Sequence, residues 1–402
     1  MVKMKASCLL CAILLLAACS PIRREEPARP EVLALAKGRL GRPVSLALSG
    51  DRLLAVFSDW ETTSLYLVEV PLGPHLPADS PRPAMIDKID ATPPLSPTFG
   101  AHALLVRNDS VSVLYQVREG GEKFVLKLVT KPLKADQWTL DVVEPPGDPI
   151  ALLPGDGGKL DIFWAAGSLL ARARAGALEP LSVCSPFAPE GRASFFESDP
   201  HVDEAPAGTG RIAQARAREI AQARARGFTV YDAYSKALLA FRWSGGGFEQ
   251  RDITDGNPIH SSLLTREGLL AVLTWDPRAH RLFLLEEEPR SGEFRRTTVT
   301  LCDGTVTVVL LPADASPGSS RMGFRFLFDE ARRLGGGKVK YYLSLLTADA
   351  SRGIAARRYR KTVLLSGDEP IESFAAAEAS DALYILALQG SLKLLRIGLA
   401  AK

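Results

Sequence analysis

The side chains that most often carry metal or acid–base chemistry are few and scattered in this chain of 402 residues. No two histidines have the HxxxH or HExxH spacing that turns a pair of imidazoles toward one metal, and no cysteine stands at ligand spacing from a histidine. The five histidines are His75, His102, His201, His260 and His280. We therefore predict no zinc site, and the sequence indicates no metal ion and no cofactor.

One short segment does gather carboxylates around a histidine. Residues 195–204 read FFESDPHVDE and contain Glu197, Asp199, His201, Asp203 and Glu204. Carboxylate oxygens are the ligands that hard cations such as Ca²⁺ prefer. The same composition is typical of a solvated acidic loop, and this second interpretation is the one we favour.

Two glycine-rich segments are candidates for ligand loops. PGDGGKLDIFW, residues 154–164, faintly resembles the calcium loop of FG-GAP repeats, but its leading positions lack carboxylates. A tight hairpin with its turn at Asp156 and Gly157 is favoured instead. RLGGGKVKYY, from Arg333, lacks the hydroxyl and the helix that a phosphate-binding loop needs, so we expect a flexible connection into a strand.

No nucleophile motif is present. The sequence contains neither the GxSxG pattern of serine hydrolases nor the SxDxGxxW box of sialidases. An active site assembled from separate loops would leave no such motif, so catalysis stays open as the less favoured alternative. No catalytic residue is predicted.

Arginines are concentrated in RIAQARAREIAQARARG, residues 211–227, which contains IAQARAR twice. Alanine, glutamine and arginine favour helix, so we expect one short helical insertion at about residues 205–227. At about 100° per residue the arginines point in most directions, and only Ile212 and Ile220 could form an apolar face. An insertion on the rim is favoured over a membrane helix. With a net charge of only +3, no nucleic-acid partner is expected.

Two further basic clusters are RMGFRF, from Arg321, and RGIAARRYRK, from Arg352. Acidic segments such as LLEEE balance them in composition, so they are interpreted as local solvated surfaces. The alternative is an anion-binding surface, which would require the clusters to converge on one face of the fold.

The N-terminus has the parts of an export signal. MVKMK is basic, residues 6–18 are apolar but too few to span a bilayer, and small residues precede Cys19 in LAACS. LAACS resembles the lipobox of bacterial lipoproteins. The resemblance implies that residues 1–18 are a lipoprotein signal peptide. It also implies that a diacylglyceryl group is transferred to Cys19, that the chain is cleaved before this residue, and that the new N-terminus is then acylated by palmitate or a similar chain. Ser20 follows the cysteine in place of aspartate, which favours the outer membrane by the sorting rule of enterobacterial lipoproteins.

A lipid anchor would place the rest of the chain in the cell envelope, on a periplasmic or extracellular face. The partner of the protein is then first of all a membrane, reached through acylated Cys19. Residues 19–30 are charged and rich in proline, which is typical of a short tether.

Beyond the tether the amino-acid sequence contains internal repeats. Alternating apolar residues dominate, and helical periodicity is scarce. The LLAV at positions 53–56 returns at positions 269–272, and LDIFWAAGSL from Leu160 returns as LYILALQGSL from Leu383. Each of these two offsets equals four units of roughly 54 residues, a period typical of repeat architectures.

Prolines mark where these units begin, at Pro43, Pro97, Pro149, Pro258 and Pro370. The first two gaps between these prolines are each close to one unit in length, and the last two are each close to two units. Two more units are therefore expected to begin near residues 194–203 and 305–314, which makes seven units. The insertion then falls between the first and second strands of the fourth unit.

Each unit can be divided into four short strands, the content of a propeller blade. We therefore predict an all-β fold, a seven-bladed β-propeller over residues 31–402. The last unit has three strands, and EVLALAKG from Glu31 is expected to supply its outer strand and close the ring. Two stacked β-sandwich domains are the alternative. In the propeller, Cys184 and Cys302 end outer strands with a blade between them, so both thiols are predicted to be unpaired.

The sequence thus favours a membrane-anchored, extracytoplasmic binding or scaffolding lipoprotein with an envelope protein as its partner. The long segments around residues 71–83, 185–227 and 312–321 are where that partner would be met. The scaffold lipoprotein of the outer-membrane barrel-assembly machinery is similar in architecture alone. The alternative is a small-ligand receptor or hydrolase with a site at the central channel.

Overall fold

The structure is a computed structural model of the chain. It describes residues 30–89, 102–107, 109–119, 123–143, 148–154, 160–166, 169–174, 177–180, 227–232, 237–244, 247–253, 260–266, 269–276, 278–288, 291–301, 308–313, 323–348, 359–379 and 381–399.

Several predictions of the sequence fall outside these residues. They are the signal peptide and tether with Cys19, the acidic segment at 195–204, the predicted helix within 205–226, and the two cysteines Cys184 and Cys302. The strand before Cys302 is described and ends at Leu301 as the fourth strand of its sheet, as the division into units predicts.

The described strands form antiparallel sheets, all but one of them four-stranded. Three sheets come from the first half of the chain: β2 (Ser45–Ser49), β3 (Arg52–Asp59), β4 (Ser64–Pro71) and β5 (Ala84–Lys88); β6 (His102–Arg107), β7 (Ser110–Glu119), β8 (Lys123–Pro132) and β9 (Thr139–Val143); β10 (Asp148–Pro154), β11 (Leu160–Ala166), β12 (Leu169–Arg174) and β13 (Ala177–Pro180).

Three more sheets follow in the second half: β14 (Gly227–Asp232), β15 (Ala237–Ser244) and β16 (Gly247–Asp252); β17 (His260–Arg266), β18 (Leu269–Asp276), β19 (Arg281–Glu287) and β20 (Phe294–Leu301); β21 (Val308–Ala313), β22 (Gly323–Arg333), β23 (Val339–Ala348) and β24 (Tyr359–Gly367). The remaining sheet has the order β1-β27-β26-β25 and joins the two ends of the chain: β1 (Glu31–Lys37), β25 (Ser373–Glu378), β26 (Ala382–Gln389) and β27 (Ser391–Gly398).

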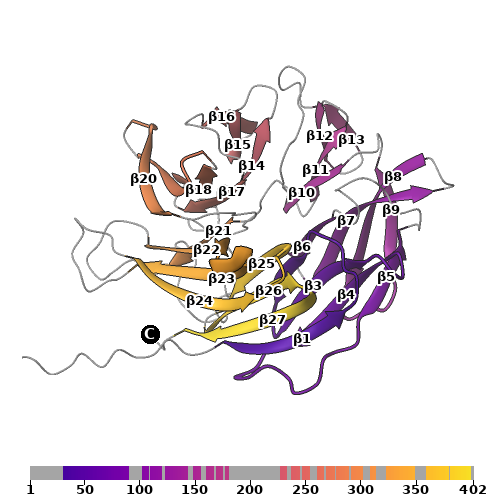
Figure 1. Cartoon of the computed structure of the whole chain (residues 1–402). Helices are drawn as coiled ribbons and strands as arrows, with labels where there is room; N and C mark the ends of the chain where they lie inside the picture. The colour runs from indigo at the N-terminus through magenta and orange to yellow at the C-terminus, as the bar shows by residue number, and fades with distance from the viewer. Residues whose placement is uncertain are drawn as a thin grey trace, which may run out of the picture.

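Successive sheets follow one another around a common centre (Figure 1). The first strand of a sheet contacts the first strand of the next: β25 contacts β2, β2 contacts β6, β6 contacts β10, β14 contacts β17, and β17 contacts β21. This radial arrangement of twisted antiparallel sheets is that of a β-propeller. The prediction of an all-β fold is confirmed. Within the described residues the one helical element is the 3-10 turn η2 (Gly335–Gly337), and none of them forms a helix long and apolar enough to cross a membrane.

The repeated text occupies equivalent places in different sheets. Both LLAV runs lie in second strands, β3 and β18, and the pair LDIFWAAGSL and LYILALQGSL runs from second into third strands. At the end of β3, Asp59 accepts hydrogen bonds from the Glu61 N–H (2.9 Å) and the Thr62 hydroxyl (3.0 Å). At the end of β18, Asp276 accepts one from the Arg278 N–H (2.9 Å). The repeated aspartate therefore closes the turn between second and third strands.

Apolar clusters hold neighbouring sheets together. One joins the β2–β5 sheet to the β25–β27 sheet and includes the buried residues Leu53, Phe57, Tyr384 and Leu386. A second joins the β21–β24 sheet to the β25–β27 sheet, and others lie between β2–β5 and β6–β9 and between β17–β20 and β21–β24. Faces of sheets pack on one another because apolar side chains of both faces leave water together.

The fourth sheet corrects one prediction. β14 is the first strand in its order β14-β15-β16, and it contacts β17, the first strand of the next sheet. The placement of the arginine-rich segment between the first and second strands of this unit is therefore wrong for the described strands. The segment precedes β14, and Gly227, its last residue, is already the first residue of that strand. The two strand patterns could not be told apart in sequence because inner and second strands are both apolar. The other new unit start, near 305–314, is confirmed by β21.

A loop covers the outer strand β1. Residues 72–83, between β4 and β5, cross over to β1, where the His75 ring lies 3.0 Å from the Glu31 carboxylate and the Leu76 N–H donates to it over 2.8 Å. The Ser80 hydroxyl donates to the Ala34 carbonyl. Residues 71–83 are one of the segments predicted above to meet a partner. In the structure this loop covers β1, an edge strand that otherwise would expose backbone groups.

Candidate functional site

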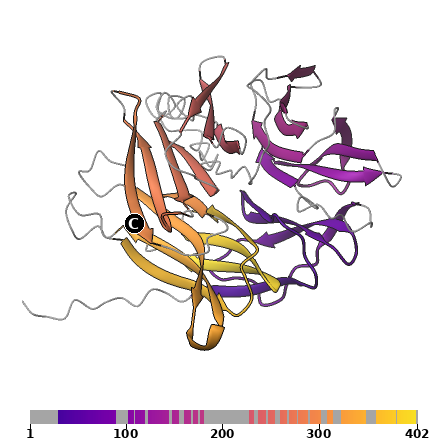
Figure 2. The same cartoon turned by 45° about the horizontal axis from the view of Figure 1, so that its top comes forward.

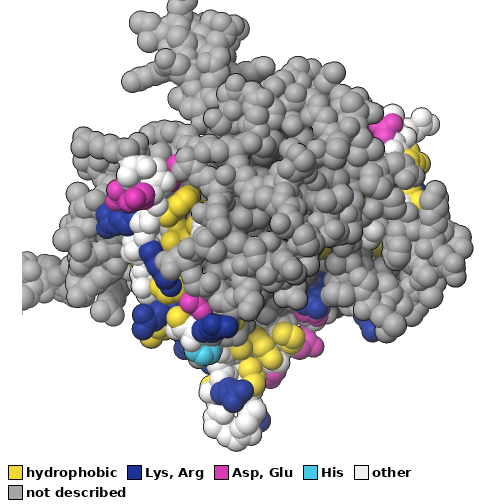
Figure 3. Space-filling view, turned by 90° about the horizontal axis from the view of Figure 1, so that it is seen from above, with side chains coloured by type: hydrophobic (Ala, Val, Ile, Leu, Met, Phe, Trp, Pro, Cys, Tyr) yellow, Lys and Arg dark blue, Asp and Glu magenta, His cyan; other side chains and the backbone are white. Residues whose placement is uncertain are grey.

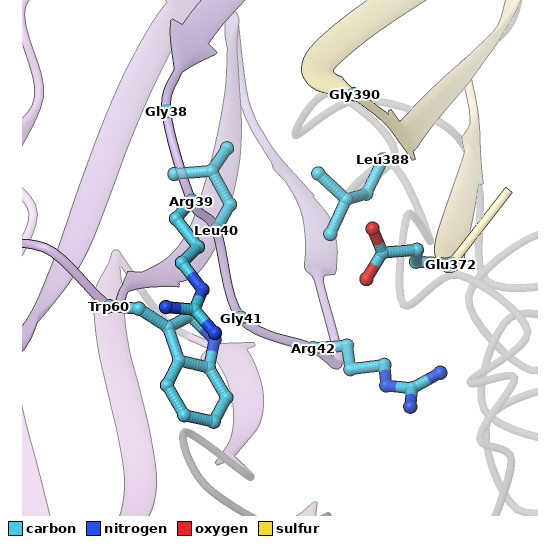
Figure 4. A pocket seen from close by; sticks show the side chains of 9 residues that line it. All are labelled: Gly38, Arg39, Leu40, Gly41, Arg42, Trp60, Glu372, Leu388 and Gly390. Atoms are coloured by element: carbon cyan, nitrogen blue, oxygen red, sulfur yellow. The ribbon is translucent and has the colours of Figure 1, made fainter. Parts of the chain in front are cut away.

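A cleft lies where the chain passes from β1 to β2, beside the sheet of β25–β27. Its volume is about 370 Å³, and it is lined by Gly38, Arg39, Leu40, Gly41, Arg42, Trp60, Glu372, Leu388 and Gly390. Figure 4 shows Arg39, Leu40 and Trp60 on one side, Glu372 and Leu388 on the other, and Arg42 below Glu372.

The connection from β1 to β2 is held against the end of β3. The Gly41 N–H donates to the Ser58 carbonyl over 2.8 Å, the Trp60 N–H donates to the Arg39 carbonyl over 2.8 Å, and Leu40 pairs with Asp59 in an antiparallel bridge. These bonds fix the backbone between Arg39 and Gly41, although it belongs to no strand. This fixed backbone sets the directions of the Arg39 and Leu40 side chains. Leu40 is buried and Arg39 is exposed.

Trp60 forms one wall of the cleft. The Arg39 guanidinium lies over its ring, with the Cζ atom 5.8 Å from the ring centroid. This is within the range of a cation–π contact, which is weak where solvent reaches it. Gly41 makes room for the indole, because a Cβ at this position would lie 2.8 Å from Trp60 Nε1 and 2.3 Å from Ser58 Oγ. The wall therefore depends on a glycine at residue 41.

The opposite wall comes from the end of the chain. The Glu372 N–H donates to the Leu388 carbonyl over 2.9 Å, which joins the start of β25 to the end of β26. Below it, the Val44 N–H donates to the Ser373 hydroxyl over 3.2 Å and ties the start of β2 to β25. Two sheets from opposite ends of the sequence thus frame one site.

The charges of the cleft are only partly balanced. Arg39 and Arg42 contribute two positive charges and Glu372 one negative charge. Within the described part of the chain, neither arginine forms an ion pair. An arginine presents several N–H donors in a plane and binds carboxylates or phosphates through two of them. Next to the half-buried indole of Trp60, this set suits a ligand that joins an anionic group to an apolar part.

The cleft lies at one end of the sheets, and we call this end the cleft end. It is where the turns between second and third strands lie, among them 60–63 with Trp60 and the β26–β27 turn with Gly390. The connections from an outer strand to the next first strand lie there too, because strands alternate in direction. β1 therefore begins, at Glu31, at the opposite end.

The sequence did not identify these residues as a site. Trp60 follows the first LLAV run by a few residues, and Arg39, Arg42 and Glu372 stand in no motif. Their signal is positional: each lies just before a first strand or just after a second strand, where propeller loops reach one face. Within the described residues, no group of three or more His, Cys, Asp or Glu side chains is placed to hold a metal ion.

The predicted basic clusters contribute structural ion pairs. Arg325 donates to Glu378 over 2.6 Å, and its side chain is only 13% exposed. Lys361 contacts the buried carboxylate of Glu330. The interpretation of these clusters as solvated surfaces is wrong for these two residues, because strand pairing turns them toward neighbouring acids. Where the face seen from above is described, basic side chains are interspersed with acidic and apolar ones (Figure 3).

A second cluster of charges fixes the start of β1. Arg396 donates to Asp381 over 2.9 Å and lies 3.4 Å from Glu31. The hydrogen bond from the Leu76 N–H, with the nearby His75 and Arg396, lowers the pKa of the Glu31 carboxyl below its ordinary value. This cluster is structural in character, since each of its groups already has a partner.

Comparisons with known proteins give the fold. No protein-family model and no curated protein matches the chain. Among solved structures, the chain is similar to YCF48 bound to a D1 peptide, with a TM-score of 0.54, 12% identity, and coverage of 94% of this chain and 98% of that one. It is also similar to a catalytically inactive virginiamycin B lyase from Staphylococcus aureus with quinupristin, with a TM-score of 0.51, 10% identity, and coverage of 92% and 99%. At such identities the likeness shows the β-propeller fold alone.

Proposed function

We propose that the chain is a lipid-anchored β-propeller that binds a protein partner through its cleft end. In this proposal the propeller has seven blades, and β1 is the outer strand of the last one. The ladder from Glu31 to Lys37 along β27, with one register shift between Ala34 and Ala36, supports the closure, as does the apolar cluster between the β2–β5 and β25–β27 sheets.

The proposed anchor would leave the cleft end free. The tether of residues 19–30 leads into Glu31, which lies at the end of the sheets opposite the cleft. Extended, these residues reach roughly 40 Å. A membrane held by acylated Cys19 would face that opposite end, and the cleft would point toward proteins of the envelope.

The observation that carries the proposal is the composition of the cleft. Arg39 and Arg42 offer planar donors that no described carboxylate engages, beside the indole of Trp60. A peptide segment that contains a carboxylate and an apolar side chain would satisfy both parts. Because both arginines are exposed, each such ion pair contributes no more than about 1 kcal/mol.

The test is a crosslinking pull-down of the acylated protein from its own envelope. The variant Arg39→Ala/Arg42→Ala should lose the partner that the wild-type chain recovers. A control with the same loss of charge, Lys134→Ala/Arg295→Ala, removes exposed cations elsewhere and should recover it normally. Equal recovery by the cleft variant and the control would refute the cleft as the binding site, and recovery of no protein by the wild type would refute the partner.

A small-ligand receptor is the second candidate, and the volume of the cleft supports it. About 370 Å³ lies at the lower end of the range of small-molecule pockets. A panel of small carboxylates, measured by the shift of melting temperature, distinguishes the two. Stabilisation of the wild-type chain by a free carboxylate, absent in Arg39→Ala/Arg42→Ala, would favour the receptor.

A further inference from the structure

The hairpin between β22 and β23 extends beyond its own sheet. β21 pairs with β22 only as far as Phe328, and β24 pairs with β23 only from Tyr341 onward. Residues 332–333 and 339–340 therefore pair only with each other and form a short two-stranded ribbon, which the turn 334–338 closes. Figure 2 shows this hairpin projecting from the neighbouring sheets at the bottom of the view. It is a turn between second and third strands, so it projects from the cleft end.

The tip of the hairpin has no packing role. Gly336 and Gly337 have φ of 77° and 78°, which glycine adopts without strain. A Cβ at any of residues 335–337 would have no neighbouring atom within 4 Å, and Leu334 is 47% exposed. The Leu334 N–H donates to the Lys338 carbonyl over 2.7 Å and closes the turn. The hairpin is thus ordered by its own backbone.

The ribbon is strongly basic. No Asp or Glu occurs between residues 331 and 348, whereas the same stretch contains Arg332, Arg333, Lys338 and Lys340. Arg332 and Lys340 are direct partners in the antiparallel ladder, so their side chains share one face of the ribbon. Like charges placed directly opposite destabilise a strand pair. The repulsion between Arg332 and Lys340 therefore destabilises the ribbon, although the packing of the ribbon does not require a cation at either position.

Only one of the two opposed cations has a partner among the described residues. The Arg332 guanidinium lies 3.4 Å from Glu330 Oε1 and 5.1 Å from the Tyr342 ring. Glu330 is itself buried, and it also contacts Lys361 and accepts a hydrogen bond from the Ser344 hydroxyl over 3.1 Å. Within the same described part of the chain, Lys340 forms no ion pair. A further carboxylate between Arg332 and Lys340 would relieve their repulsion.

We propose that this basic hairpin, residues 332–340, docks an acidic segment of a protein partner. The carboxylate binds between Arg332 and Lys340, and Arg333 and Lys338 attract neighbouring acids. A membrane surface suits the hairpin less well, since its tip offers one exposed leucine and no tryptophan or phenylalanine for the interface. The inference rests on the charges of the ribbon and holds whether or not the cleft binds a ligand.

The experiment measures the affinity of the full-length acylated protein, in micelles of a neutral detergent, for a fluorescent deca-glutamate peptide. Lys340→Glu removes the repulsion across the ribbon, so its melting temperature should equal or exceed that of the wild type. Its affinity for the peptide should fall about three- to tenfold, because the attraction of a half-buried cation is replaced by a repulsion. Lys134→Glu makes the same charge change at a third-to-fourth strand turn at the other end, and its affinity should stay within about twofold of the wild type.

Two results would overturn the inference. One is equal weakening by Lys340→Glu and Lys134→Glu, which would show that only net charge matters. The other is binding of the wild-type protein to short-chain phosphatidylglycerol, added to the same micelles, that Lys340→Glu abolishes although this variant keeps the wild-type affinity for the peptide. The hairpin would then bind a lipid headgroup. Small carboxylates, which test the cleft, should shift the melting temperature of Lys340→Glu as much as that of the wild type, which separates this test from that of the cleft.

Discussion

Replacing Gly41 by alanine measures how tightly the connection between β1 and β2 packs on β3. The added Cβ would lie 2.3 Å from Ser58 Oγ and 2.8 Å from Trp60 Nε1, and real Cβ atoms do not come so close. Ser58 is fully buried, so its side chain has little room to move. Overpacking of this kind costs about 1–3 kcal/mol of the free energy of unfolding. Trp60 is only half-buried and is expected to shift into the cleft.

The assay is urea denaturation followed by tryptophan fluorescence. Gly335→Ala is the matched control, because its Cβ would meet no atom within 4 Å and its stability should change by no more than about 0.5 kcal/mol. Ser58→Ala removes the closest clash, and its hydroxyl makes no hydrogen bond among the described residues, so it should be nearly neutral alone. In Gly41→Ala/Ser58→Ala, about half or more of the lost stability should return. Equal stabilities of Gly41→Ala and Gly335→Ala would refute the packing.

Three other predictions concern charges and the anchor. The hydrogen bond from the Leu76 N–H and the nearby His75 and Arg396 lower the pKa of Glu31, so its stabilisation is present above the ordinary value of 4.5 and is lost as the pH falls through the lowered one. Because this carboxyl is about a third exposed, Glu31→Gln should cost no more than about 1 kcal/mol at pH 7, and unfolding midpoints should show that cost shrinking steadily as the pH falls below 4.5. Arg325→Met should lower the free energy of unfolding by about 1–3 kcal/mol, because it leaves the half-buried Glu378 carboxylate without its partner. Arg325→Met/Glu378→Leu should lower it by less than the two single substitutions combined, which a double-mutant cycle of denaturation measurements checks. Cys19→Ser should move the protein from the membrane fraction to the soluble fraction without changing its melting temperature, and continued membrane association would contradict the proposed anchor.

Strand patterns were readable from the sequence where they repeat. The LLAV runs identified second strands, and the text from Leu160 and Leu383 identified second and third strands, because each blade must bury the same apolar face against its neighbour. The predicted start of the fourth unit, near residues 194–203, lies outside the described residues, in which the fourth sheet begins at Gly227. There the arginine-rich segment interrupts the period, and apolar alternation does not distinguish a first strand from a second.

The site was not readable in the same way. Arg39, Trp60 and Glu372 lie far apart along the chain, and each stands alone in its own stretch of sequence. Their meeting depends on the contact between the first and last sheets, which local patterns do not encode. The ion pairs could not be predicted from the sequence either. Arg325 and Lys361 belong to basic clusters, but the strand register turns each side chain toward an acid that lies elsewhere in the sequence.

By itself, the sequence determined the all-β class, the repeated four-strand unit and the expectation of an export signal, because periodicity and composition are local properties of the chain. Only the tertiary structure decided which loops share a face, which charges are already paired, and where the two cleft arginines meet an indole. The physical reason is the radial stacking of the sheets. It gathers turns that lie far apart in the sequence at one end of the molecule, and short-range sequence patterns carry no information about such neighbours.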